Sequence, residues 1–226
     1  MSKYKILERH KNTKWVVDHY NYINQMDKKL TEQQKIANSE LTNISKKYKD
    51  TTDKGPFTSY DIKHNYTEIY DKLISPYRTK QNIKLLEIGV RWGGSLLMWK
   101  DFLPNAEIYG VDINPIDNKN VLSCDRIHVF QFDAYDSEQI AKNLGDLKFD
   151  IIIDDGSHRL QDQIQMINLW HTRLENEGAL IIEDIQNINN AKNIIANFSG
   201  PINKCSVIDR THCVPSLDDI NVVYFI

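Results

Sequence analysis

The sequence predicts an α/β fold in which a mostly parallel sheet of seven strands carries helices on both faces, with an N-terminal helical arm in front. The first observation is that strand-like and helix-like segments alternate from residue 84 onward. The second is that the strand-like segments are nearly continuous apolar runs, such as Ile151 to Ile153, which are typical of strands buried on both faces. The third is that 226 residues, 41% of them hydrophobic, suffice for one such domain and an accessory segment. Alternation of this kind predicts parallel strands joined by helices.

The arm comprises residues 1–50, which hold 11 Lys and Arg against 6 Asp and Glu and contain no Gly or Pro. Apolar residues at helical spacing, at 23–30 and again at 36–44, predict one or two amphipathic helices there. Because its basic residues are interleaved with acids, we interpret the arm as a partly solvated helical element or a contact between two copies of the chain. It is not expected to bind nucleic acid.

Residues 51–83 form a second segment, which we expect to act as a lid over cofactor and substrate. Gly55-Pro56 interrupts it. A helix is predicted after it, because four residues at helical spacing would form one apolar side, namely Tyr66, Ile69, Tyr70 and Leu73.

The main domain covers residues 84–226. Its seven strand-like segments are 84–90, 106–113, 126–134, 149–155, 178–185, 203–210 and 220–226. Its predicted helices are 94–103, 137–145, 159–174 and 189–198. Gly145 is a suitable C-cap, and the helix at 159–174 carries Leu160, Ile164, Ile167 and Leu174 at helical spacing.

Composition excludes several classes of protein. A net charge of −3 argues against a chain that mainly binds nucleic acid or an anionic membrane. No apolar run approaches the roughly 20 residues of a membrane helix, and the first residues lack the apolar core of a secretory signal. The three cysteines, Cys124, Cys205 and Cys213, have no metal-type spacing, and this sparse, odd count is typical of a reduced setting. We therefore expect a cytoplasmic protein.

Acidic residues follow five successive strands at the point where each strand ends. They are Glu87, Asp112, Asp133, the pair Asp154 and Asp155, and the pair Glu183 and Asp184. In parallel α/β sheets, ligands bind outside the carboxyl ends of the strands. The pattern therefore predicts a ligand site at this edge of the sheet, and its charge indicates a cationic ligand.

The first strand leads into a glycine-bearing turn, "LEIGVRWGGS", with Gly89, Gly93 and Gly94. This spacing is not G-x-G-x-x-G, and the P-loop pattern is also absent. Asp112 lies 23 residues after Gly89, a position suited to ribose hydroxyls in either an NAD or an S-adenosylmethionine site. Glu87 would repel the pyrophosphate of NAD and attract the sulfonium and ammonium groups of S-adenosylmethionine, so we favour the latter.

The motif E-x-G-x-x-x-G at Glu87, Gly89 and Gly93, together with Asp112 and Asp133, resembles the cofactor site of class I S-adenosylmethionine-dependent methyltransferases, which have a Rossmann-like sheet. The stretches "TDKG", "HNYTEIY", "IDDGSH" and "IIEDI" further resemble the metal-dependent sugar O-methyltransferases of macrolide biosynthesis and their relatives in glycan modification.

The resemblance implies a role for each matching position. Asp155, Glu183 and Asp184 correspond to the ligands of a divalent metal, and His158, paired with Asp155, corresponds to the catalytic base. Carboxylates suit Mg²⁺ or Mn²⁺ and not zinc, and a histidine pKa near 6.5 suits a base. The cofactor contacts are expected at Thr52, Lys54, Glu87, Gly89, Arg91, Gly93, Ser95, Asp112, Asp133 and Asp154.

Neighbouring residues receive structural interpretations. We expect Gly156 to allow a sharp turn and Ser157 to cap the next helix. We expect Trp92, Trp99 and Trp170 to be core residues or a wall of the cofactor site.

The leading hypothesis is an S-adenosylmethionine-dependent O-methyltransferase that acts on a sugar hydroxyl of a glycan, a nucleotide-sugar or a glycosylated metabolite. A phenolic acceptor is the alternative within enzymes. A non-catalytic cofactor-binding scaffold is the alternative outside them, and an NAD-dependent oxidoreductase ranks third. The sequence leaves open which sugar, which hydroxyl and which oligomeric state apply.

Overall fold

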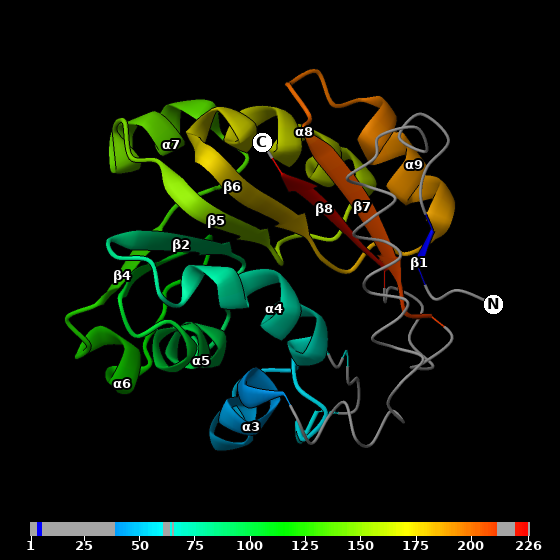
Figure 1. Ribbon diagram of the computed structural model, residues 1–226. Coiled ribbons are helices and arrows are strands. Elements are labelled where there is room, and N and C mark those ends of the chain that lie inside the picture. The colour runs from blue at the N-terminus through cyan, green and yellow to red at the C-terminus, as the bar shows by residue number, and fades with distance from the viewer. Residues whose placement is uncertain (1–3, 6–38, 61–63, 65, 212–219, 226) are drawn as a thin grey trace.

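The computed structural model describes residues 4–5, 39–60, 64, 66–211 and 220–225. Its centre is an eight-stranded sheet with the order β1-β7-β8-β6-β5-β2-β3-β4 (Figure 1). The strands are β1 (Tyr4–Lys5), β2 (Ile83–Ile88), β3 (Ala106–Asp112), β4 (Ile127–Gln131), β5 (Phe149–Asp154), β6 (Leu174–Ile182), β7 (Lys204–Asp209) and β8 (Ile220–Phe225).

The sheet has a parallel and an antiparallel part. The neighbours β4, β3, β2, β5 and β6 are parallel, whereas β8 pairs antiparallel with both β6 and β7. These seven strands confirm the predicted mostly parallel sheet. The order reverses between β2 and β5, so the carboxyl ends of these two strands form the crevice where ligands bind in such sheets.

Helices cover both faces of the sheet (Figure 1). The described helices are α3 (Glu40–Ser45), α4 (Thr67–Ile74), α5 (Gly94–Phe102), α6 (Lys119–Leu122), α7 (Ser137–Leu144), α8 (Leu160–Trp170) and α9 (Ile188–Ala196), with short 3₁₀ turns at Lys46–Tyr48, Ser75–Tyr77 and His171–Arg173. One apolar core lies between the sheet and α3, α4 and α5, and the other lies between the sheet and α7, α8 and α9. Side chains alternate between the two faces of the sheet along each strand, so one strand contributes residues to both cores. Ile151 and Ile153 belong to the first core, and Ile152 to the second.

Two features differ from the sequence expectations. The predicted helix at 159–174 ends at Trp170, and Leu174 begins β6, where it pairs with Phe149. The apolar side chain of Leu174 can fill the core beside α7 and α8 from the end of a helix or from the start of a strand. Its spacing in the sequence therefore does not distinguish a helix from a strand.

The second difference concerns the arm. Tyr4–Lys5 forms a short strand antiparallel to β7, so the arm is not wholly helical. Helix α3 confirms helical structure at 40–45, with Ser39 as its N-cap, and the other arm predictions at 6–38 lie outside the described residues. Within the described part of the chain, no helix is long and apolar enough to cross a membrane.

Candidate active site

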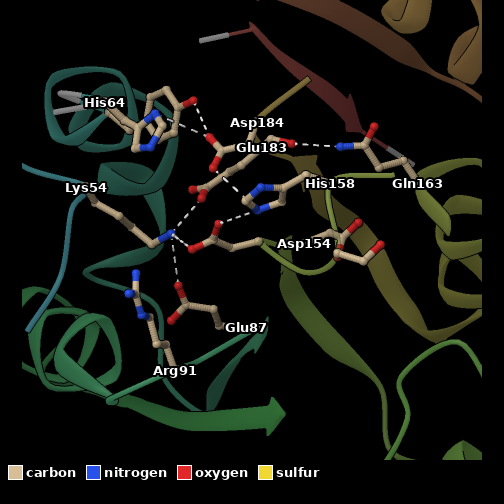
Figure 2. A network of polar contacts seen from close by, with 12 residues as sticks. Lys54, His64, Glu87, Arg91, Asp154, His158, Gln163, Glu183 and Asp184 are labelled. Atoms are coloured by element: carbon tan, nitrogen blue, oxygen red, sulfur yellow. Dashed lines mark hydrogen bonds and ion pairs between the residues drawn. The ribbon is translucent and has the colours of Figure 1, made fainter. Parts of the chain in front are cut away.

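The acids that the sequence places at strand ends surround the crevice between β2, β5 and β6 (Figure 2). Glu87 lies near the end of β2, Asp155 directly after β5, and Glu183 and Asp184 directly after β6. Hydrogen bonds from backbone N–H groups fix these strand ends to one another. Asp155 donates to the carbonyl of Ile88, and Glu183 donates to the carbonyl of Asp154. The sheet therefore holds carboxylates from three strands at one point.

A single ammonium group lies among three of these carboxylates. The Nζ atom of Lys54 is 2.6 Å from Glu183 Oε2, 2.7 Å from Asp155 Oδ2 and 3.1 Å from Glu87 Oε1. The Lys54 side chain is only 1% exposed. Burial lowers the pKa of Lys54, but the charges of Asp155, Glu183 and Glu87 outweigh this effect and raise it well above the ordinary value. Lys54 is thus a permanent buried cation.

Beside Lys54, a second cluster brings together Asp155, His158 and Asp184. The Nε2 atom of His158 lies 3.3 Å from Asp155 Oδ1 and 3.4 Å from Asp184 Oδ2. One ligand atom from each of the three residues falls within 4.8 Å of the others, close enough for one ion to contact all three. The structure therefore brings these three side chains together at one point.

Two members of the cluster have left-handed backbone conformations. The φ angles are 56° at His158 and 54° at Asp184, and Arg91 on the opposite loop has 52°. Such angles are uncommon for residues other than glycine and cost free energy. The surrounding contacts hold these three side chains toward the crevice despite that cost.

The electrostatic field of the cluster changes the protonation of its members. Burial raises the pKa of Asp184 to about 6, with a contribution from the charge of Asp155. Burial lowers the pKa of His158, but the hydrogen bond to Asp155 and the charge of Asp184 raise it to about 9. Burial raises the pKa of Asp155, but the charge of Lys54 dominates and lowers it to about 2. Without a further cation, His158 is therefore a protonated partner of two acids.

Helix α4 contributes hydrogen-bond donors that the sequence analysis did not assign. Tyr66 Oη donates to Asp184 Oδ1 at 2.5 Å, and Tyr70 Oη donates to Glu183 Oε1. His64 Nδ1 lies 3.5 Å from Asp184 Oδ1. The sequence placed Tyr66 and Tyr70 on the apolar side of a helix and offered Tyr66 and His64 as possible lining of a substrate cleft, but it did not predict these hydrogen bonds. Their hydroxyl groups at a spacing of four residues were the available signal, since both project from the same face.

A cavity of about 570 Å³ opens beside this cluster, a size typical of small-molecule sites. Its wall contains six of the residues expected to bind cofactor or to act in catalysis, namely Gly89, Arg91, Asp112, Asp133, Asp155 and His158. Thr52 and Ser95 line a smaller adjoining hollow that also includes Gly89, Arg91 and Asp155. These eight predicted positions therefore line two adjoining hollows that share Gly89, Arg91 and Asp155.

Four other predicted cofactor residues do not line these hollows. Lys54 and Glu87 face each other in the buried cluster, and Glu87 also accepts a hydrogen bond from Trp99 Nε1 at 3.1 Å. Gly93 is the N-cap of α5, and Asp154 accepts a hydrogen bond from the hydroxyl group of Tyr135 at 3.1 Å. Burial raises the pKa of Asp154 to about 7. A direct cofactor contact for these four stays a prediction.

The proposed cap and one tryptophan differ from expectation. Arg159, not Ser157, is the N-cap of α8, and the hydroxyl group of Ser157 instead bonds to Asp162. Trp99 and Trp170 are buried as expected, but Trp92 is 45% exposed and stacks on Tyr60. The turn after β2 orients Trp92 away from the core, because Arg91 adopts the left-handed conformation just before it.

Asp112 shows how the glycine turn is held next to the cavity. Its Oδ2 atom accepts hydrogen bonds from the backbone N–H groups of Val90 and Arg91 at 2.9 and 2.8 Å. Its Oδ1 atom accepts one from Asn114 at 2.8 Å. The carboxylate thus stabilises the loop that it faces, and it remains part of the cavity wall.

Residues 86–185 match the family model described as "Methyltransferase domain". Among curated proteins, the chain is 43% identical over 102 residues to mycinamicin VI 2''-O-methyltransferase of Micromonospora griseorubida, a match that covers 42% of this chain and 25% of that protein. It is 34% identical over 132 residues to the 8-demethyl-8-(2-methoxy-alpha-L-rhamnosyl)-tetracenomycin-C 3'-O-methyltransferase of Streptomyces olivaceus, over 54% of this chain and 32% of that protein. The chain therefore matches about a quarter to a third of the length of these relatives.

Solved structures give the same result. The MycE methyltransferase of the mycinamycin biosynthetic pathway, in complex with Mg, SAH and mycinamycin VI, superposes with a TM-score of 0.52 at 35% identity. The superposition covers 64% of this chain and 39% of MycE. The chain thus resembles metal-dependent sugar O-methyltransferases in both sequence and fold.

Proposed function

We propose that this chain, whose residues 86–185 form a methyltransferase domain, is an S-adenosylmethionine-dependent O-methyltransferase. Its acceptor is a sugar hydroxyl of a glycan, a nucleotide-sugar or a glycosylated metabolite, and a divalent metal and His158 assist the transfer. The observation that carries the proposal is the convergence of Asp155, His158 and Asp184 beside the cavity at Gly89. The similarity to methyltransferases of macrolide and tetracenomycin sugars supports the acceptor class.

The cavity fits the methyl donor. Its volume of about 570 Å³ is of the size expected for a nucleoside with an amino-acid side arm, and we assign Asp112 and Asp133, which line it, to the ribose and the adenine. When bound, S-adenosylmethionine would supply a methyl group from its sulfonium, and the sulfur would then remain in the cofactor product as a neutral thioether. The acidic edge of the sheet favours that positive charge over the pyrophosphate of NAD.

The second cluster fits a divalent metal. Asp155 and Asp184 are hard oxygen donors, and the backbone strain at Asp184 shows that its orientation is imposed by the fold. The ligand role of Glu183 stays part of the proposal, although both of its oxygens already contact Lys54 and Tyr70. When bound, Mg²⁺ or Mn²⁺ supplies Lewis-acid polarisation of an oxygen nucleophile.

His158 is the residue that would accept the proton of the acceptor hydroxyl. It lines the cavity and is 35% exposed, so a bound acceptor can reach its ring. In the field of Asp155 and Asp184 alone it is already protonated, because its pKa is about 9. Positive charge placed against those two carboxylates offsets their effect and lowers the pKa of His158. Proton acceptance by His158 is therefore linked to occupation of the acidic cluster.

The test is methyl transfer to a panel of glycosides and phenols, measured with and without chelator. The proposal expects transfer to glycosides, loss of turnover with chelator, and retained binding of S-adenosylhomocysteine (SAH). Transfer to phenols alone would establish the alternative acceptor. Cofactor binding with no transfer, together with an unchanged His158→Ala variant, would favour the scaffold. Activity that is indifferent to chelator would refute the metal.

A further inference from the structure

Lys54 occupies a position that neither the cofactor site nor the metal set explains. It comes from the segment before the sheet, yet its ammonium group contacts carboxylates at the ends of three strands (Figure 2). Its backbone is equally constrained, because its carbonyl accepts hydrogen bonds from the N–H groups of Tyr66 and Thr67 at 2.8 and 3.2 Å. The side chain therefore joins the start of α4 to the crevice.

The contacts of Asp155 show what the ammonium group does to the carboxylates. Lys54 holds Asp155 Oδ2 at 2.7 Å, and the other oxygen, Oδ1, faces His158 at 3.3 Å. Glu183 is fixed in the same way, with Oε2 on Lys54 and Oε1 on Tyr70. A carboxylate with one oxygen fixed has lost most of its rotational freedom, so its second oxygen presents a defined direction.

Charge also requires a cation at this point. Glu87, Asp155 and Glu183 all approach the same point in a buried space, and without the ammonium group their side chains would turn apart to relieve their mutual repulsion. A carboxylate that is turned away from the site cannot serve as a ligand for Mg²⁺. These effects oppose the direct repulsion between Lys54 and a nearby metal ion, which by itself would weaken metal binding.

We propose that Lys54 is a positioning residue for the metal site, which fixes the carboxylates of Asp155 and Glu183 and links residues 51–60 to that site. The inference rests on the proposed function, because the metal is part of it. It extends that function by making the segment before the methyltransferase domain a component of metal binding. It also assigns Lys54 to the acids and not to the methyl donor.

The experiment measures Mn²⁺ affinity by electron paramagnetic resonance at saturating SAH, SAH affinity by calorimetry, and the thermal midpoint, for the full chain. The variant is Lys54→Met, and Lys47→Met is the matched control, since Lys47 is 64% exposed and contacts only Asp101 at 3.0 Å among its described ion pairs. Loss of an outer-shell partner typically weakens metal binding about 10- to 100-fold. We expect that loss in Lys54→Met, SAH affinity within about threefold of the wild type, and no change in the control.

The double variant Lys54→Met/Glu87→Gln separates positioning from simple charge compensation. It removes one positive and one negative charge, so the cluster of Lys54 and its three acidic partners keeps its net charge. We expect the thermal midpoint to recover while Mn²⁺ affinity stays at least about tenfold below the wild type. This charge-balanced variant also carries the test if Lys54→Met does not fold.

The outcomes are distinct. Recovery of Mn²⁺ affinity together with stability in the double variant would overturn positioning and leave only a countercharge. Unchanged or increased Mn²⁺ affinity in Lys54→Met would overturn it as well, since Lys54 would then be indifferent to the metal or compete with it. A wild-type protein that binds SAH but no Mn²⁺ would refute the metal in the proposed function, and the inference with it.

Discussion

The substitution Gly89→Ala tests the packing on which the site depends. Gly89 has a φ angle of +81°, and a Cβ atom there would lie 2.0 Å from the carbonyl oxygen of Asp155. The neighbouring atoms belong to backbone, so they cannot rotate away. The left-handed conformation costs an alanine about 1–2 kcal/mol, and overpacking of this kind typically adds about 1–3 kcal/mol. We therefore expect a loss of about 2–5 kcal/mol in the free energy of unfolding.

Gly93→Ala is the matched control. Its φ angle is +75°, nearly the same, but its Cβ atom would meet the Cγ2 atom of Val121 at 2.6 Å. That contact is with one side-chain methyl group and not with backbone, so we expect a smaller overpacking cost than at Gly89 and a total near the conformational part, about 1–2 kcal/mol. The difference between the two variants isolates the contact with Asp155.

Urea unfolding followed by circular dichroism measures both variants. With a slope of about 3 kcal/mol per M, the midpoint should fall by about 0.7–1.7 M for Gly89→Ala and about 0.3–0.7 M for Gly93→Ala. Because Gly89→Ala displaces the backbone of Asp155, its Mn²⁺ affinity should fall as well, whereas Gly93→Ala should retain it. Equal midpoints for the two variants, or wild-type Mn²⁺ affinity in Gly89→Ala, would refute the reasoning.

Three further predictions address the chemistry. His158→Ala should lower kcat about 10²- to 10⁴-fold and leave SAH affinity within about threefold, as steady-state kinetics and calorimetry can check; a smaller loss would remove His158 from proton transfer. Asp184→Asn should weaken Mn²⁺ binding at least about tenfold with little effect on SAH, whereas Asp133→Asn should do the reverse; loss of both ligands in both variants would show unfolding instead. In the metal-free protein, NMR should give His158 a pKa of about 9, which Mg²⁺ should lower, and His158→Gln assigns the signal. Because this pKa exceeds the ordinary value of 6.5, the contact of His158 with Asp155 contributes to the free energy of unfolding below about pH 6.5, and this contribution is lost as pH rises through about 9. A pKa at or below 6.5 in the metal-free protein would contradict that contact.

Much of the fold follows from local patterns in the sequence. The apolar runs of β2 to β8 are long enough to identify strands, and Gly145, expected as a C-cap, marks where α7 ends. The acids at strand ends predicted the position of the site, because parallel strands bring their carboxyl ends together. Leu174 was misplaced because an apolar residue at the end of a helical pattern fits a strand equally well.

The contacts of Lys54 could not be predicted in the same way. Its partners Asp155 and Glu183 lie 101 and 129 residues further along the chain, and nothing in a lysine's sequence neighbourhood reports such distant charges. The left-handed conformation of Asp184 is likewise not specified by its neighbours in the sequence, because it depends on tertiary contacts. Strained positions of this kind are expected at functional sites.

The candidate site combines residues from two parts of the chain, one inside the match to the family model and one before it. Every acid of the crevice, from Glu87 to Asp184, lies inside the methyltransferase match at 86–185. Of the donors that fix these acids, Lys54, Tyr66 and Tyr70 lie before it, whereas Trp99, which donates to Glu87, lies inside it. A sheet edge with acids can attract cations but cannot define their geometry, because free carboxylates rotate. In the proposed function, Lys54, Tyr66 and Tyr70 therefore help to orient the carboxylates of this acidic crevice.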